Sequence, residues 1–240
     1  LKTIGSDIFQ NSGLSTFTAP QSVLDVFGVT VGEGRTVGGS GDVEVVLLLT
    51  IIDGTEILTD TIVQNNIDDG TRAVDVIIRG FSSIGNNAFN LSGVSGSITL
   101  PASVKSIGFK AFSSCSSLTS VSFESGSQLT TIGNNAFESS GLSGSITIPA
   151  SLTSIGEKAF SSCSSLTSVS FELNSQLSTI GNNAFESSGL SGSVTFPASL
   201  TSIGDYAFSS CSSLTSVSFE RGSQLTTIGV GDPFLYSGLP

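Results

Sequence analysis

The sequence predicts a repeat solenoid built on a parallel β-sheet, mainly β with short helical or 3₁₀ turns. The residues SSCSSLTSVSFE at 113–124 recur without change at 161–172 and at 209–220, so the chain repeats one long unit at a fixed interval. Within that unit the element Ile-Gly-x-x-Ala-Phe occurs twice, at steps that are alternately shorter and longer, so each unit contains two coils. The segments 118–123 and 142–148 alternate apolar and polar residues, as half-buried strands do. One such strand from each coil, always in the same direction, produces a parallel sheet.

Each coil is expected to hold its elements in the same order. In the strand 118–123, Val121 and Phe123 point inward, toward the core. A turn follows, opened by a proline such as Pro149 or by a Ser-Gly-Ser-Gln run. The glycine after each isoleucine permits a sharp bend, and the Ala-Phe pair begins a short helical or 3₁₀ turn that drives its phenylalanine into the core. Stacked coils then align an internal aromatic ladder of Phe112, Phe137, Phe160, Phe185 and Phe208.

The chain divides into three regions. Residues 1–23 form one N-terminal coil, and residues 81–240 form a solenoid of alternating 23- and 25-residue coils. Residues 24–80 contain no Ile-Gly-x-x-Ala-Phe element. They form either a β-rich insertion of hairpins, which we favour, or a set of degenerate coils. Strong turn signals separate four candidate strands in this region, at 26–31, 43–52, 56–63 and 73–78.

The repeat resembles a known family. The string LTSIGEKAFSSCSSLTSVSFE, at 152–172, is similar to the BspA-like leucine-rich repeat family, whose units read roughly I-G-x-x-A-F-x-x-C-x-x-L-x-x-I-x-L-P. The resemblance covers residues 81–229 closely and residues 1–23 loosely. It implies a solenoid of leucine-rich-repeat type and an extracellular or cell-surface protein that acts in adhesion and matrix binding. The asparagine that usually follows the strand is absent, so no asparagine ladder is expected at that turn.

Composition excludes several classes of function. The net charge is −11 with eight basic residues, so nucleic-acid binding is not expected. The most apolar run, 43–52, is far shorter than the roughly 20 residues of a membrane-spanning helix, so no membrane insertion is expected. The chain has no histidine to activate a serine nucleophile. The recurring Glu124, Glu172 and Glu220 lie too far apart to act as a catalytic pair. We therefore expect no enzymatic activity.

Three cysteines, Cys115, Cys163 and Cys211, recur two coils apart, which is roughly 9.6 Å at the spacing of parallel strands. That distance exceeds the roughly 7 Å limit between the Cα atoms of a disulfide. It is also too long for one tetrahedral metal ion to join the three thiols. The cysteines are therefore predicted to be small buried side chains with a structural role.

Two further motifs are weaker candidates. The acidic turns that contain Asp53, Asp68 and Asp69 offer oxygen ligands to calcium, although Asp-Gly is first of all a hairpin turn. Apart from this alternative, no cofactor is expected. The tripeptide Asn-Leu-Ser makes Asn90 a candidate glycosylation site.

The outward face of the predicted sheet is the candidate contact surface. Alternate residues of each strand point outward, and in this chain they are Ser or Thr. Stacked coils would align them as two parallel files of hydroxyls on a nearly uncharged sheet. The candidate residues are Ser97, Thr99, Ser120, Ser122, Ser145, Thr147, Ser168, Ser170, Ser193, Thr195, Ser216 and Ser218.

The leading hypothesis is a non-enzymatic extracellular or cell-surface structural or adhesive protein that contacts matrix proteins, surface proteins or glycans through these files. The alternative without a binding function is that these small polar residues simply keep the sheet soluble. A self-assembling fibre subunit is a second alternative, because the stretch TIGVGDPFLYSGLP begins another coil and stops before its strand. Copies of the chain would then stack head to tail. An ice-binding surface is a third alternative, because regular files of hydroxyls can order water.

Overall fold

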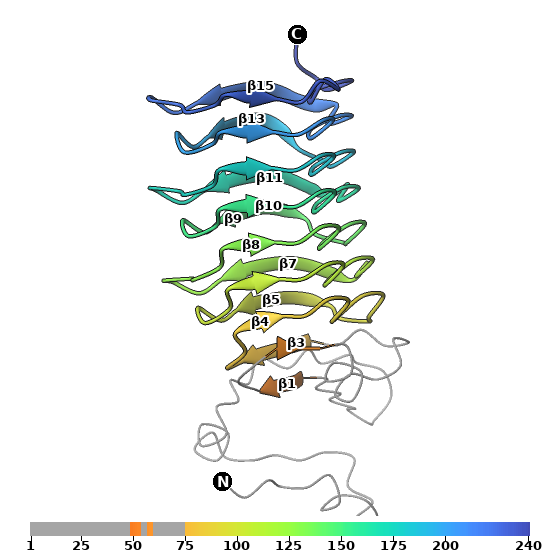
Figure 1. Ribbon diagram of the computed structural model, residues 1–240. Coiled ribbons are helices and arrows are strands. Elements are labelled where there is room, and N and C mark those ends of the chain that lie inside the picture. The colour runs from red at the N-terminus through yellow and green to blue at the C-terminus, as the bar shows by residue number, and fades with distance from the viewer. Residues whose placement is uncertain (1–48, 54–56, 60–74) are drawn as a thin grey trace, which may run out of the picture. The chain divides into compact units, whose positions relative to one another are not determined.

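The computed structural model describes residues 49–53, 57–59 and 75–240. Residues 49–240 form one compact unit, which is a stack of coils (Figure 1). The described residues contain sixteen β-strands and no helix. Each coil contributes one short and one long strand, and the chain runs around the stack from one to the other.

The short strands form one continuous parallel sheet, which we call the narrow sheet. It has eight strands, and isoleucines stack on isoleucines along it, as Ile107 does on Ile132. We did not predict this sheet from the sequence. Its strands are β2 (Ile57–Leu58), β4 (Ser83–Ile84), β6 (Ser106–Ile107), β8 (Thr131–Ile132), β10 (Ser154–Ile155), β12 (Thr179–Ile180), β14 (Ser202–Ile203) and β16 (Thr227–Ile228).

The long strands, which we call the broad strands, pair two by two and in parallel. In the pair β5–β7, Gly96 opposes Leu118 and Ser97 opposes Ser120, so Thr119 is the extra residue of a β-bulge. The broad strands are β1 (Leu49–Asp53), β3 (Asp75–Arg79), β5 (Gly96–Leu100), β7 (Leu118–Phe123), β9 (Gly144–Ile148), β11 (Leu166–Phe171), β13 (Ser191–Phe196) and β15 (Ser213–Phe219).

These strands confirm the predicted parallel solenoid and its strand positions. The prediction at 118–123 coincides with β7, and the prediction at 142–148 contains β9. Val121 is buried as expected, whereas Phe123 is only partly buried.

The region 24–80 differs from the hairpins that we favoured. Its described strands are β1, β2 and β3, and β1 pairs with β3 in parallel, from Leu49 opposite Asp75 to Asp53 opposite Arg79. β2 extends the narrow sheet by pairing in parallel with β4. A hairpin requires antiparallel neighbours, so the described residues of this region fit the alternative of degenerate coils better than the hairpins. The candidate strand 26–31 and the N-terminal coil 1–23 lie outside the described residues.

The corner between the narrow sheet and the broad strands, where we expected a short helical or 3₁₀ turn, is a pair of turns closed by bonds between residues three positions apart, and no helix follows in the described coils. In one such corner, the N–H of Ala136 donates to the Gly133 carbonyl (3.3 Å), and that of Ser140 donates to the Phe137 carbonyl (3.1 Å). Asn135 and Ser139 adopt left-handed backbone, with φ of 56° and 55°.

The neighbouring coil explains why no helix forms at this corner. The N–H groups of Asn135, Phe137 and Ser139 donate to carbonyls of the following coil at 2.8 to 2.9 Å. Every second N–H group is therefore used between coils. A helix would need those groups for bonds within its own turns.

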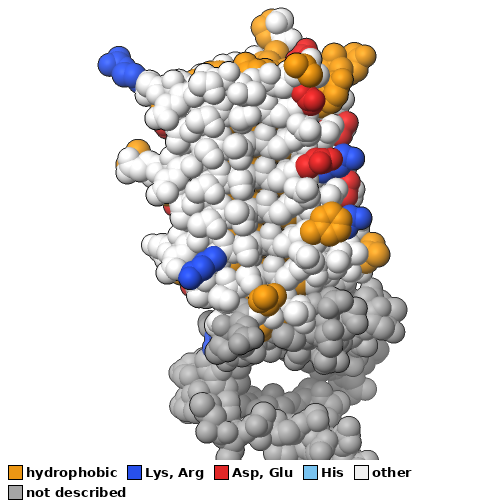
Figure 2. Space-filling view, in the orientation of Figure 1, with side chains coloured by type: hydrophobic (Ala, Val, Ile, Leu, Met, Phe, Trp, Pro, Cys, Tyr) orange, Lys and Arg blue, Asp and Glu red, His pale blue; other side chains and the backbone are white. Residues whose placement is uncertain are grey.

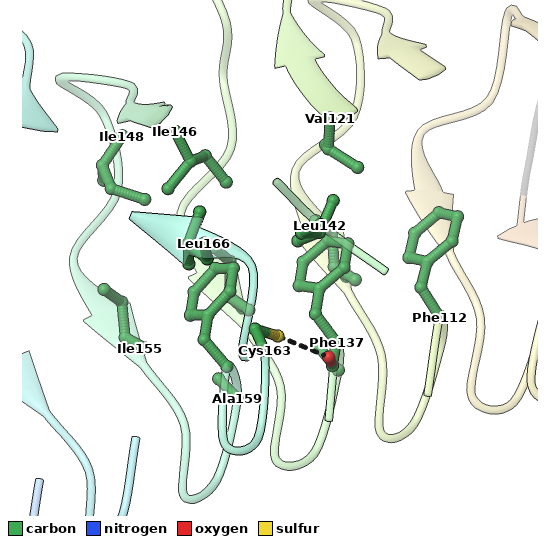
Figure 3. Close-up of a cluster of buried hydrophobic side chains, with 14 of the residues drawn as sticks. Phe112, Val121, Phe137, Leu142, Ile146, Ile148, Ile155, Ala159, Cys163 and Leu166 are labelled. Atoms are coloured by element: carbon green, nitrogen blue, oxygen red, sulfur yellow. Dashed lines mark hydrogen bonds between the residues drawn. The ribbon is translucent and has the colours of Figure 1, made fainter. Parts of the chain in front are cut away.

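The core is a column of stacked side chains. Phenylalanine rings stack from Phe89 to Phe234 with centroids 4.8 to 5.5 Å apart, which confirms the predicted ladder and extends it by one ring at each end. Figure 3 shows Phe112 and Phe137 beside each other, among buried Leu and Ile side chains. Each ring packs against its copies in the neighbouring coils, and this packing holds the coils in register.

Candidate functional site

The twelve predicted contact residues lie on the outer side of the broad strands. Eleven of them are exposed and Ser168 is half-buried. They belong to the six strands from β5 to β15, and their partners across each pair are in register, as Ser97 is with Ser120 and Thr99 with Ser122. The structure therefore brings them together as two files. The files differ in their hydrogen bonds.

In one file, which we call the paired file, the hydroxyls bond to each other across the two strands of each pair. The oxygens lie 2.9 Å apart in Thr99–Ser122, 3.1 Å apart in Thr147–Ser170 and 2.9 Å apart in Thr195–Ser218. A hydroxyl that already serves a neighbour has less hydrogen-bonding capacity left for a ligand. The paired file therefore helps to join the coils.

The other file, which we call the serine file, has free hydroxyls. Among the described residues, none of its six side chains has a hydrogen-bond partner, and the same residue type stands there in both kinds of coil. Each hydroxyl can therefore both donate to and accept from a molecule outside the chain. The members are Ser97, Ser120, Ser145, Ser168, Ser193 and Ser216.

A further row of hydroxyls runs beside the narrow sheet, and sequence reasoning missed it. Thr130 donates to the Lys105 carbonyl and Thr153 to the Thr130 carbonyl, both at 2.9 Å. Ser178 and Thr201 continue the row in the same way. The pair of hydroxyl residues that precedes most of the Ile-Gly elements, with Lys105 in place of one of them before Ile107, was the available signal in the sequence. Because these hydroxyls bond to backbone carbonyls, their role is to join coils.

The recurring acids also have a structural role. A carboxylate oxygen of Glu124 accepts from the N–H of Ala102 at 2.9 Å, and Glu172 and Glu220 repeat this contact in the later coils. Asn86 accepts from the N–H of Phe109 at 2.8 Å, at the corner turn and not after a broad strand. These side chains satisfy N–H groups of neighbouring coils and so compensate for the lack of regular sheet bonding there.

The three cysteines are buried and free, as predicted. The thiol of Cys163 donates to the Phe137 carbonyl at 3.1 Å (Figure 3), and Cys115 and Cys211 make the same contact with Phe89 and Phe185. Burial raises the pKa of Cys115 and of Cys163 to about 11. The pKa of Cys211 is raised by the same cause. The thiols are therefore protonated at neutral pH, and they act as small core residues with one weak donor.

The remaining candidate sites stay predictions. Asn90 is half-buried in the first described corner turn, where its N–H donates to the Asn87 carbonyl at 3.0 Å. Asp53 is the last residue of β1, and Asp68 and Asp69 lie outside the described residues. Within the described ranges, no helix is long and apolar enough to cross a bilayer.

Charged and apolar side chains gather at the edges of the stack. Figure 2 shows one face that is almost free of charge, with acidic, basic and hydrophobic side chains along its margins.

Comparison with known proteins agrees with this geometry. A family model described as "BspA type Leucine rich repeat region" matches residues 82–215 in six copies. The crystal structure of the pneumococcal vaccine antigen PcpA is 25% identical, with a TM-score of 0.58 over 79% of this chain and 48% of that one. This chain thus spans about half the length of PcpA. A leucine-rich repeat protein of T. pallidum is 27% identical, with a TM-score of 0.54 over 65% of this chain and 73% of that one. No curated protein sequence matches the chain.

Proposed function

Because this chain belongs to the BspA-type leucine-rich repeat family, we propose that it is a non-enzymatic extracellular or cell-surface protein that makes adhesive contacts through the outer face of its broad strands. The observation that carries the proposal is the serine file. Six hydroxyls without intramolecular partners, five exposed and one half-buried, stand at one place in successive coils. The surrounding face is a nearly uncharged sheet, which suits a neutral partner such as a glycan or the backbone of a matrix protein.

The spacing of the file indicates how such a contact works. Neighbouring coils are separated by about 4.8 Å, so an extended partner can meet several hydroxyls in a row. Each single hydrogen bond contributes only about 0.5 to 1.5 kcal/mol net. Adhesion would therefore depend on many equivalent contacts acting together, which is an arrangement that a repeat protein provides.

The test is binding of the whole chain to immobilised matrix proteins and to a glycan array. Thr147→Lys combined with Thr195→Lys places two charges on the outer face and should abolish binding while thermal unfolding stays cooperative. A matched control, Thr153→Lys with Thr201→Lys, adds the same charge beside the narrow sheet, at the position where Lys105 stands naturally. Binding that survives the first pair, or that both pairs remove equally, would contradict the proposal.

A milder variant tests the free hydroxyls themselves. Ser145→Ala with Ser193→Ala removes two hydroxyls of the serine file and no intramolecular hydrogen bond. The unfolding temperature should stay unchanged and binding should weaken severalfold. Unchanged binding would mean that these hydroxyls serve only solubility.

A head-to-tail fibre is a second candidate. The coil of β15 and β16 exposes Phe219, Ile228 and Val230, which a further coil would cover. In a fibre, the further coil that covers these side chains would belong to a second copy of the chain. In a longer chain it would belong to the same molecule. Removal of 228–240 should stop filament formation seen by negative-stain electron microscopy, and filaments from the shortened chain would refute end stacking.

Ice binding draws less support, because half of the outward hydroxyls already bond to one another. Thermal hysteresis in a solution of the protein would nevertheless favour it over both other candidates.

A further inference from the structure

The three copies of the long repeat unit act as an internal comparison of what the fold requires. From one unit to the next, the outward hydroxyl files do not change, whereas the corner turns do. The two residues after the Ile-Gly of alternate coils are Phe109-Lys110, then Glu157-Lys158, then Asp205-Tyr206. Because all three pairs occupy the same turn, the fold itself does not demand any one of them.

Two tyrosines occupy corner-turn positions at which the other coils have different, smaller or more flexible residues. Tyr206 takes the place of Lys110 and Lys158, and Tyr236 takes the place of serines such as Ser187 and Ser210. Both have left-handed backbone, with φ of 56° and 57°, which is unfavourable for a bulky side chain. Both are also exposed, Tyr206 to 40% and Tyr236 to 76%. Neither the backbone nor the core explains a large aromatic residue at Tyr236, and the Tyr206 ring packs only against Gly231 of the next turn.

The exposure of the two rings does not come from their place near the last described coil. Tyr206 is followed by another turn, whose Gly231 carbonyl accepts from the Tyr206 N–H at 3.1 Å. The position of Tyr236 is exposed in interior coils as well, where Ser162 and Ser187 occupy it. Tyr236 is therefore largely exposed at the corner of the stack, whereas the Tyr206 ring lies against Gly231 of the next turn and leaves part of its surface exposed.

The same two turns carry acids and no base. Asp205 accepts from the N–H of Gly231 at 3.1 Å, and Asp232 accepts from the N–H of Phe234 at 2.9 Å. These contacts fix each carboxylate through one oxygen, and the other oxygen has no hydrogen-bond partner among the described residues. The lysine that accompanies the acid in the preceding unit is replaced by Tyr206. Arg221 of this unit follows β15 and so lies roughly 20 Å away along that strand, and Lys158 stands at the same corner two coils earlier, roughly 9.6 Å away.

We propose that Tyr206 and Tyr236, together with Asp205 and Asp232, form a docking site for a basic segment of another protein. A Lys or Arg side chain binds over the face of a tyrosine ring, and carboxylates nearby supply charge-assisted hydrogen bonds. Tyrosine is enriched in protein interfaces, where its ring fills much area at a low cost in side-chain entropy. The net charge of −11 steers a basic partner toward the chain. A second copy of the chain fits poorly, because its own acids would oppose Asp205 and Asp232.

The test uses the whole chain and a fluorescein-labelled oligo-arginine peptide, at an ionic strength of about 0.15 M so that distant charges are screened. The variant Tyr206→Lys with Tyr236→Ser installs the residues that interior coils have at these positions, so the fold accepts both. Fluorescence anisotropy should show the affinity for the peptide falling by about tenfold or more, since one desolvated cation–π contact is worth a factor of that order. Thermal unfolding confirms that the variant is folded.

The control variant is Thr153→Lys, which adds the same charge at a position where Lys105 stands in the preceding unit. Its affinity for the peptide should change by no more than about twofold, because the added charge lies outside the patch and is screened. Equal losses in both variants would mean that net charge alone attracts the peptide, and no loss in the double variant would remove the site. The proposal would also be overturned if Tyr206→Lys with Tyr236→Ser kept its affinity for the peptide but lost binding to neutral glycans or self-association. None of these results bears on the serine file, which lies on the broad strands.

Discussion

At the scale of single residues, the glycine after each isoleucine serves close packing. We expected it to permit a sharp bend, but its backbone does not adopt positive φ in any described coil. A Cβ atom on Gly133 would instead lie 2.8 Å from the Gly108 carbonyl carbon and 2.9 Å from the Ile107 oxygen. These are backbone atoms of the preceding coil, which cannot move aside singly. The glycine therefore sets how closely the coils approach.

Gly133→Ala should destabilise the protein by about 1 to 3 kcal/mol, because the added methyl group overpacks the contact between two coils. Urea unfolding followed by circular dichroism measures this loss. Gly126→Asn is the matched control. Gly126 has a φ of 76° and open space around its Cβ position, and Asn174 occupies the equivalent position with a φ of 59°. The control should change stability by less than about 0.5 kcal/mol, and an equal loss in both variants would contradict the packing argument.

At the scale of elements, no strand is stable alone. The strands of the narrow sheet have two residues each, and the broad strands pair only two by two. Such short ladders leave many backbone groups to other partners, which here are the corner turns, the recurring glutamates and the hydroxyls beside the narrow sheet. The phenylalanine ladder lies beneath these corners and supplies the apolar burial that makes each coil depend on its neighbours.

Phe137→Ala should cost about 3 to 5 kcal/mol, because it leaves a cavity in the middle of the ladder between Phe112 and Phe160. The measurement is the free energy of unfolding in urea. Phe109→Ala serves as the control, because Phe109 is 43% exposed at the corner and should cost far less. A small loss for Phe137→Ala would show that neighbouring rings collapse into the space, and the ladder would then not be a main source of stability.

At the scale of the whole molecule, stability is approximately a sum over coils and over the contacts between them. The unit that repeats is a pair of coils, because shorter and longer coils alternate along the sequence and the broad strands pair accordingly. The proposed functions follow the same division. The serine file is the same in every described coil from β5 to β15, whereas the aromatic and acidic patch at Tyr206 belongs to one unit.

Deletion of residues 144–191 removes one complete unit, and Ser143 would then precede Gly192 as it now precedes Gly144. The shortened chain should fold, with a parallel-sheet circular dichroism spectrum, and unfold cooperatively at a lower temperature. Its urea m-value should fall because less surface is exposed on unfolding. Deletion of the single coil 121–145, after which Ser120 would precede Ile146 as Ser145 now does, should be far more disruptive, since it places two coils of the wrong kind together. Equal behaviour of the two deletions would mean that single coils are the unit.

Several features followed from the sequence by itself. The fixed interval between the repeated segments and its division into two coils predicted the parallel solenoid, the strands β7 and β9, the aromatic ladder and the buried cysteines. These predictions succeeded because a fixed repeat places identical side chains above one another, and identical apolar side chains stack. The outward position of the hydroxyl files followed from the same alternation along each strand.

Other features were decided only by the tertiary structure. These are the narrow sheet, the bonds that link the corner turns of neighbouring coils, the parallel pairing of β1 with β3, and the division of the outer hydroxyls into a paired file and a free serine file. Each depends on which N–H, carbonyl or hydroxyl groups meet between residues 22 to 26 positions apart. A local sequence pattern predicts which way a side chain points, but the group to which it hydrogen-bonds belongs to the next coil. The choice between a structural hydroxyl and one free to bind therefore appears only when the coils are stacked.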